Sequence, residues 1–154
     1  MQETLKLYGR NLESRILLGT GRYESPMQLA EAIKAADPAM VTVALRKEVQ
    51  GSSRAGQSSW DILRAAGRPL LPNTAGCYTV KAAVNTALMA REVFETDLLK
   101  LEVIGDDQNL QPDPFGLVKA AAELIKRGFC VLPYCTVTMT LCCAGAYSMS
   151  DVRC

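Results

Sequence analysis

Five apolar segments of strand length recur along the chain, separated by polar or helical segments. They begin at Ile16 (ILLGTG), Met40 (MVTVAL), Pro69 (PLLPNTAG), Leu98 (LLKLEVIG) and Cys130 (CVLPYC). Their spacing is about 30 residues, the length of one βαβ unit. Because nearly continuous apolar strands are typical of sheets covered on both faces, the pattern predicts parallel strands.

Helical periodicity fills the intervals between these segments. The run SPMQ at 25–28 combines an N-cap serine, a proline for the first turn and a glutamine three residues after the cap, which predicts a helix to about Ala36. Thr79 begins a second helix that ends near Phe94, and Asp113 begins a third that stops at Gly128. The region between the second and third strands is predicted to be a loop over 51–59 and a short helix over 60–66.

Two architectures fit alternating parallel βα units. A doubly wound sheet normally carries G-x-G-x-x-G after its first strand, and the corresponding GTGRYE lacks the third glycine. A (β/α)8 barrel of the TIM type is therefore favoured. Such a barrel needs about 250 residues, so the 154 residues present, with five predicted strands, represent an incomplete barrel.

Composition narrows the classes of function. With 49% apolar and 21% charged residues, the chain can build one globular core. A formal charge of +1 without charged runs gives no reason to expect nucleic acid or a membrane surface as partner. The polar N-terminus does not resemble a signal peptide, and no apolar run reaches the roughly 18 residues of a membrane span. We therefore expect a cytoplasmic protein with a small-molecule or protein partner.

No histidine is present among the 154 residues, so the commonest metal ligand and general base is missing. The six cysteines form no paired Cys-x-x-Cys pattern and are expected to be reduced structural thiols. Asp106 and Asp107 have no third carboxylate beside them, which favours a loop over a metal site. No metal and no cofactor are therefore expected, and catalysis would use Lys, Asp, Glu, Tyr or Cys.

Two charged residues interrupt the fourth apolar segment. Lys100 and Glu102 are two positions apart, so on a strand their side chains point to the same face. If that face is the interior of a barrel, both lie toward the carboxyl end of the strand, where barrel enzymes build their active sites. A lysine withdrawn from water favours the neutral amine that attacks a carbonyl carbon, and a nearby carboxylate can move protons. Spacing alone leaves open an ion pair on the exposed face of an edge strand.

Three further places carry candidate binding groups, each with an ordinary alternative. Asn73, Thr74 and Gly76 belong to a loop that substrate can approach, but asparagine and glycine are also common turn residues. Arg46, at the end of the second strand, is placed either to meet an anion or to lie solvated on the surface. Tyr134 is expected to pack near the mouth of the barrel.

The segments around the predicted strands resemble thiazole synthase of thiamine biosynthesis. The resemblance rests on GTG after the first strand, TVALR after the second, LLPNTAG after the third, KLEVIGD around the fourth and the run LQPDPFGLVKAAAELIKRGFCVLPY. It covers roughly residues 5–136, and LLPNTAG together with KLEVIGD is highly specific.

This resemblance implies a (β/α)8 barrel that condenses 1-deoxy-D-xylulose 5-phosphate with dehydroglycine. Sulfur would come from the thiocarboxylated C-terminus of a small sulfur-carrier protein. Lys100 matches the imine-forming lysine of the family, and Glu102 matches a proposed acid/base. A dehydroglycine-producing enzyme and further copies of the chain are the other implied partners.

Two other functions stay open at this stage. The chain would be a non-enzymatic fragment that still binds protein partners or subunits, or an aldolase-like Schiff-base enzyme that acts on another sugar phosphate. The family-specific LLPNTAG disfavours the aldolase-like alternative.

After Thr136 the sequence continues as VTMTLCCAGAYSMSDVRC and loses the resemblance. One set of codons for this stretch also encodes DDLVLCRRLLDV in a shifted frame, which resembles the continuation of the family. We therefore expect a family-like segment 1–136 and a frameshifted tail 137–154. The family's phosphate-binding loops and another proposed acid/base lie beyond this point, so little activity is expected from the chain.

Overall fold

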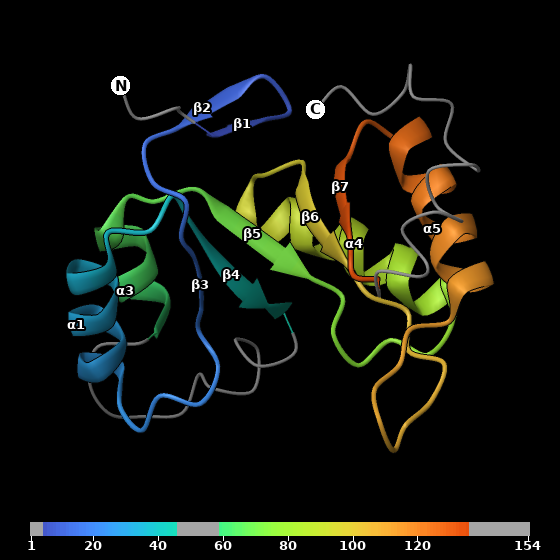
Figure 1. Ribbon diagram of the computed structural model, residues 1–154, viewed down its shortest axis with the longest axis horizontal. Helices are drawn as coiled ribbons and strands as arrows, with labels where there is room; N and C mark the ends of the chain where they lie inside the picture. The colour runs from blue at the N-terminus through green and yellow to red at the C-terminus, as the bar shows by residue number, and fades with distance from the viewer. Residues whose placement is uncertain (1–4, 46–58, 136–154) are drawn as a thin grey trace. The chain divides into compact units, whose positions relative to one another are not determined.

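A computed structural model describes residues 5–45 and 59–135 (Figure 1). Arg46, most of the loop predicted for 51–59 and the tail 137–154 lie outside the described residues. Backbone contacts divide the chain into two compact units, Met1–Leu71 and Pro72–Cys154.

The first unit opens with a hairpin that the sequence patterns did not predict. β1 (Leu5–Leu7) and β2 (Arg10–Leu12) pair antiparallel. The two residues between them, Tyr8 and Gly9, have φ values of 47° and 74°. Positive φ at both central residues is the requirement of the tight turn that matches the twist of a hairpin.

Among the described residues of the first unit, two parallel strands and two helices follow the hairpin. β3 (Leu17–Gly19) pairs in parallel with β4 (Met40–Ala44). α1 (Pro26–Ala36) lies between them in sequence, and α3 (Ser59–Ala66) follows β4. The predicted cap is confirmed, because the Oγ atom of Ser25 accepts a hydrogen bond from the N–H of Gln28. The buried apolar side chains of this unit include Leu29, Ile33, Met40, Val41, Val43, Ile62 and Leu63.

β5 (Leu70–Asn73) begins in the first unit and ends in the second. The second unit continues with α4 (Val80–Phe94), β6 (Leu98–Leu101), α5 (Pro114–Lys126) and β7 (Cys130–Pro133). Its core joins the strands to the two helices and consists of Cys77, Ala83, Val84, Ala87, Leu99, Leu101, Val103, Leu117, Ala120, Ala121, Leu124, Phe129 and Val131.

The predicted helix starts in this unit are confirmed. The Oγ1 atom of Thr79 accepts from the N–H of Ala82, and Asp113 accepts from the N–H of Phe115. Side-chain acceptors at these positions satisfy amide groups that the first helical turn leaves unpaired.

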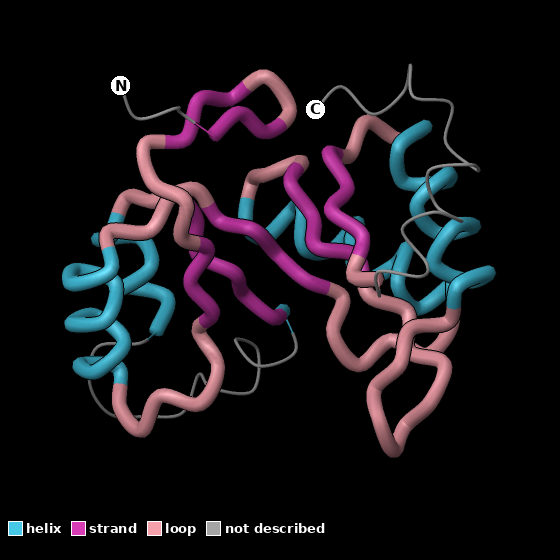
Figure 2. Tube along the Cα trace, in the orientation of Figure 1, coloured by secondary structure: helices cyan, strands magenta, loops and turns pink. Residues whose placement is uncertain are grey.

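Strand order identifies the architecture. The described sheet runs β3-β4-β5-β6-β7, so each strand neighbours the next one along the chain, and the described pairings in it are parallel. Figure 2 distinguishes the strands, in magenta, from the helices, in cyan. A doubly wound sheet instead reverses its order at a switch point. Sequential parallel strands alternating with helices are those of a TIM-type (β/α) barrel that is incomplete here. Within residues 5–45 and 59–135, none of the helices is both long and apolar enough to cross a bilayer.

Candidate functional site at the carboxyl end of β6

The two faces of β6 have different surroundings. Leu99 and Leu101, together with Val103 just beyond the strand, belong to the core that packs against α4 and α5. Since side chains alternate along a strand, Lys100 projects from the opposite face, and Glu102 continues that alternation one residue past the strand end. In a (β/α) barrel the face away from the helices is the interior. Lys100 and Glu102 therefore lie on the interior-type face at the carboxyl end of their strand.

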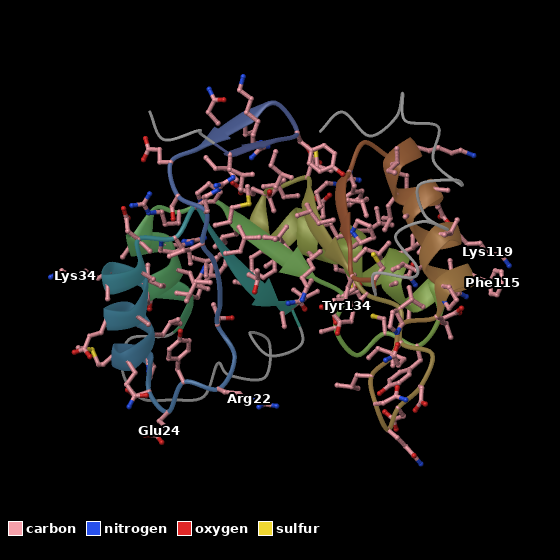
Figure 3. All side chains as sticks on the ribbon, in the orientation of Figure 1. Arg22, Glu24, Lys34, Phe115, Lys119 and Tyr134 are labelled. Atoms are coloured by element: carbon pink, nitrogen blue, oxygen red, sulfur yellow. The ribbon has the colours of Figure 1, made fainter. Side chains whose placement is uncertain are left out.

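Lys100 and Glu102 form an ion pair. The Nζ atom of Lys100 lies 3.0 Å from Oε1 of Glu102, and the side chains are 36% and 14% exposed, respectively. The same Nζ atom lies 5.1 Å from the centroid of the Tyr134 ring. Tyr134, which is labelled in Figure 3, follows β7, and its N–H donates to the carbonyl of Leu101 (2.8 Å). The lysine thus has a carboxylate and an aromatic face as neighbours, and it remains accessible to solutes.

β6 is not an edge strand. Lys100 is the register partner of Asn73 on β5 and of Leu132 on β7. Register partners on parallel strands point to the same face, so Asn73, Lys100 and Leu132 form one row across three strands. The alternative of an ion pair on an edge strand is therefore wrong.

The loop after β5 is a tight turn. The N–H of Cys77 donates to the carbonyl of Thr74 (3.1 Å), and Gly76 has a φ of 79°, a conformation that favours glycine. Oδ1 of Asn73 accepts from the N–H of Ala75 (3.2 Å). The turn geometry is sufficient to explain a glycine at position 76. In the Asn73 side chain, Oδ1 is bonded to Ala75, and Nδ2 is the atom that can donate hydrogen bonds. Substrate binding by Asn73 and Gly76 stays a prediction.

Thr74 is fully buried and reaches the main chain of Glu102. Its Oγ1 atom donates to the carbonyl of Glu102 and accepts from the N–H of Glu102, with both distances 2.7 Å. Sequence reasoning grouped Thr74 with the binding loop and did not find this contact. The spacing of residues within one segment carries no information on which side chain reaches a neighbouring strand.

The loop between β6 and α5 is closed at its base. The N–H of Asp113 donates to the carbonyl of Val103 (2.8 Å), and the N–H of Gly105 donates to the carbonyl of Gln111 (2.8 Å). A Cβ atom on Gly105 would lie 3.1 Å from the backbone of Asp113. The glycine of the KLEVIGD segment therefore permits the start of α5 to approach the end of β6 closely.

Asp106 and Asp107 help to build this loop. The carboxylate of Asp106 accepts from the N–H of Gln108 and from Nδ2 of Asn109, each at 2.8 Å. The hydroxyl of Tyr78 donates to Asp107 (2.6 Å). Among the described residues there is no group of three or more histidine, cysteine or acidic side chains that could hold a metal ion.

A cavity of about 450 Å³ in the first unit shares no lining residue with the Lys100 site. Its walls are mainly apolar side chains of α1 and α3, and its charged rim includes Asp37 and Arg68, which pair with each other. The lysine that lines it, Lys34, is exposed on α1, whereas Lys100 is paired with Glu102 at the carboxyl end of a sheet strand, where a (β/α) barrel builds its active site, so the Lys100 site is favoured.

Fold and site together define an α/β chain of the TIM-barrel type, with a lysine and a carboxylate paired at the carboxyl end of a strand. A sequence model of the thiazole biosynthesis protein ThiG family matches residues 6–149. The chain therefore belongs to this family. The matched range extends past Thr136, so the end of the family-like sequence at that residue stays a prediction.

Curated relatives agree with this assignment. The chain is 55% identical over 143 residues to the thiazole synthase of Cupriavidus pinatubonensis (strain JMP 134 / LMG 1197), covering 92% of this chain and 51% of that protein. It is 57% identical over 140 residues to the thiazole synthase of Burkholderia thailandensis, covering 90% and 51%. The chain thus spans about half the length of the curated relatives that it matches.

A solved structure supports the fold. The crystal structure of the BexX/CysO complex from Amycolatopsis orientalis contains a chain that matches with a TM-score of 0.69 and 25% sequence identity. The match covers 92% of this chain and 58% of that one.

Proposed function

We propose that this chain carries the imine-forming site of a thiazole synthase, with Lys100 as the nucleophile and Glu102 as the acid/base. The observation that carries the proposal is the 3.0 Å pair of Lys100 and Glu102 on the interior-type face at the end of β6, in a chain of the ThiG family. A reactive amine at this end of a barrel strand is in the position where the fold builds its active sites.

The chemistry begins with a carbonyl substrate, 1-deoxy-D-xylulose 5-phosphate. The neutral amine of Lys100 attacks the ketone carbon, a C–N bond forms, and the π electron pair moves to the oxygen, which takes up a proton. Loss of that oxygen as water then leaves a protonated imine. Glu102 is close enough to Nζ of Lys100 to take up and return protons in these steps. The imine withdraws electrons from the neighbouring carbon, which prepares the sugar for enolisation and later attack by sulfur.

The other reactants are proposed on the same basis. Dehydroglycine, supplied by a partner enzyme, and a thiocarboxylated sulfur-carrier protein complete the atoms of the thiazole. A protein complex is also the state in which the similar structure from Amycolatopsis orientalis was solved. Nδ2 of Asn73, in the same row as Lys100, is the group that we propose for hydrogen bonding to the sugar. We propose a cytoplasmic homo-oligomer that binds neither nucleic acid nor membrane.

Borohydride trapping tests the imine. A full-length version, in which residues 1–136 continue into the second half of the Cupriavidus pinatubonensis relative, would be incubated with 1-deoxy-D-xylulose 5-phosphate and borohydride. We expect a mass increase on the peptide that contains Lys100 and none in Lys100→Arg. Lys119→Arg is the matched control, because Lys119 is an exposed lysine on α5 outside the site (Figure 3). An adduct that persists in Lys100→Arg would reject the proposal.

A second function has one observation in its favour. The similar solved structure is a complex, so a chain without full activity can still bind a protein partner. Purified, thiocarboxylated sulfur carrier from a relative should then be retained by the immobilised 154-residue chain. If neither the carrier nor a second copy of the chain is retained, this function is excluded. Trapping with a panel of other sugar phosphates tests the aldolase-like alternative.

A further inference from the structure

The hydroxyl of Thr74 connects the turn after β5 to the backbone that carries Glu102. We propose that Thr74 is a positioning residue, which holds Glu102 where its carboxylate meets Lys100. The inference rests on the proposed function of that pair, and it assigns to Thr74 a role different from the substrate binding predicted from sequence.

The hydroxyl of Thr74 forms hydrogen bonds to the β6 segment just beyond the point where the pairing of β5 and β6 ends. Register pairing between β5 and β6 reaches Asn73 and Lys100, and the N–H of Thr74 still donates to the carbonyl of Lys100 (3.2 Å). Beyond this point, the N–H and the carbonyl of Glu102 both bond to Oγ1 of Thr74, at 2.7 Å each. One side chain therefore replaces the two backbone partners that a longer strand would supply.

These two bonds restrict the direction of the Glu102 side chain. Fixing both polar groups of a peptide residue to one atom limits the rotation of its backbone, and the backbone determines where Cβ points. The outcome is a carboxylate that is 14% exposed and 3.0 Å from the lysine nitrogen. Without the hydroxyl, the partly buried N–H and carbonyl of Glu102 would need new partners, and the residue would shift to find them.

Thr74 is not placed to touch a substrate. A hydroxyl has one hydrogen to donate, and that hydrogen goes to the carbonyl of Glu102. The whole residue has no accessible surface. Any effect of Thr74 on the reaction must therefore act through another residue.

Hydrogen exchange on the 154-residue chain tests the contact itself. Thr74→Val removes the hydroxyl and keeps the shape, whereas Thr74→Ser keeps the hydroxyl. We expect the amide of Glu102 to exchange at least about tenfold faster in Thr74→Val, and at nearly the parental rate in Thr74→Ser, because a lost hydrogen bond exposes the amide to opening. An unchanged amide in Thr74→Val would overturn the inference.

The trapping rate of the full-length version then tests the consequence for the reaction. We expect Thr74→Val to slow adduct formation on Lys100 by about tenfold and Thr74→Ser by less than about twofold. In a Glu102→Gln background no carboxylate remains to be positioned, so Thr74→Val should have almost no further effect. If Thr74 had only a structural role, Thr74→Val would slow adduct formation by the same factor in both backgrounds, and that result would overturn the inference.

The two proposals fail in different ways. If the unchanged full-length protein forms no adduct, the proposed function falls, and the positioning role falls with it, while the amide exchange still shows whether the contact exists. If the adduct forms normally in both the parent and Thr74→Val, only the positioning role is rejected. Should Thr74→Val prove too unstable to purify, Thr74→Cys, which weakens the two hydrogen bonds, takes its place in the parental and Glu102→Gln backgrounds, with Thr74→Ser as the control.

Discussion

Asp113 occupies the space that a side chain on Gly116 would need. A Cβ atom on Gly116 would lie 2.4 Å from Oδ2 of Asp113 and 3.2 Å from Cγ1 of Val103. Asp113 is the N-cap of α5, and its other carboxylate oxygen accepts from the N–H of Phe115. The helix start and the end of the β6 segment are thus packed together through the aspartate.

Gly116→Ala should therefore destabilise the chain, although alanine is the better helix former. The added methyl group pushes the Asp113 carboxylate from its capping position, and we expect a net loss of about 1 kcal/mol in the free energy of unfolding, measured in urea. In an Asp113→Ala background most of this cost should disappear. Gly19→Ala is the control, since a Cβ there would meet only an ordinary contact at 3.6 Å. An equal cost in both backgrounds would exclude this explanation.

Glu102→Gln should slow imine formation while Lys100 remains in place. The amide has nearly the same shape as the carboxylate but cannot take up a proton, so we expect the trapping rate of the full-length version to fall about 100-fold. Glu123→Gln is the matched control, because Glu123 pairs with Arg127 on the exposed side of α5. A parental rate in Glu102→Gln would remove Glu102 from the reaction.

Tyr134 should stabilise the position of Lys100 through its ring. The 5.1 Å distance from Nζ of Lys100 to the ring centroid is within the range of a cation–π contact, which is worth about 0.5 kcal/mol when both groups are partly exposed. A double-mutant cycle of Tyr134→Leu and Lys100→Met, measured by unfolding, should return a coupling energy of this size. Tyr134→Phe should keep it, and a coupling that Tyr134→Phe abolishes would point to the hydroxyl instead.

Arg91 should contribute more to stability than other exposed cations of the second unit. Its guanidinium carbon lies 4.3 Å from the centroid of Phe129, and Nη1 donates to the carbonyl of Arg127 (2.9 Å) and approaches Asp97 (3.6 Å). We expect Arg91→Ala to cost about 1–2 kcal/mol of unfolding free energy.

Two variants make the Arg91 measurement specific. Arg91→Lys should recover only part of the loss, because an ammonium does not stack on a ring and bond to a carbonyl in the way a planar guanidinium does. Lys119→Ala should stay within about 0.5 kcal/mol of the parent. If Arg91→Lys kept the full unfolding free energy of the parent, only the positive charge of Arg91 would contribute to stability.

Thiazole synthesis by the 154-residue chain is expected to be negligible. A sugar phosphate gains binding from backbone N–H groups near the last barrel strands, and this chain matches only about half of each relative. In a strain that lacks the enzyme, the full-length version should restore growth without thiamine, and the 154-residue chain should not. Growth with the shorter chain would refute the prediction. Sequencing the DNA near the codon for Val137 tests the frameshift separately.

Local signals were sufficient to predict much of the fold. Ser25, Thr79 and Asp113 each cap a helix within three residues of their own position, so their effect can be read from the sequence. The positions of β4 to β7 follow from apolar runs that contain buried residues. β3 was predicted from a similar run, although its Leu17 is 43% exposed. The hairpin of β1 and β2 was missed, because its strands are only three residues long and its turn is Tyr8-Gly9, without the usual asparagine or aspartate.

The site was predictable only in part, because some of its contacts are made between neighbouring strands. The shared face of Lys100 and Glu102 follows from alternation along one strand, and their positions at its carboxyl end are confirmed. The contact of Thr74 with Glu102 depends on the register of two strands, and the ring of Tyr134 beside Lys100 depends on a third. Register is determined by how whole faces pack, so residue spacing within one segment cannot supply it.

The closed base of the loop between β6 and α5 has a consequence for how this protein can vary. Hydrogen bonds from Gly105 and Asp113 seal the loop below its tip, and residues 108–110 are exposed. Insertions and replacements at the tip therefore leave the end of β6 where it is. An affinity tag or fluorophore for single-molecule work can therefore be inserted at this tip, beside Asn109, whose side chain bonds to Asp106 and Gln111 and should be kept.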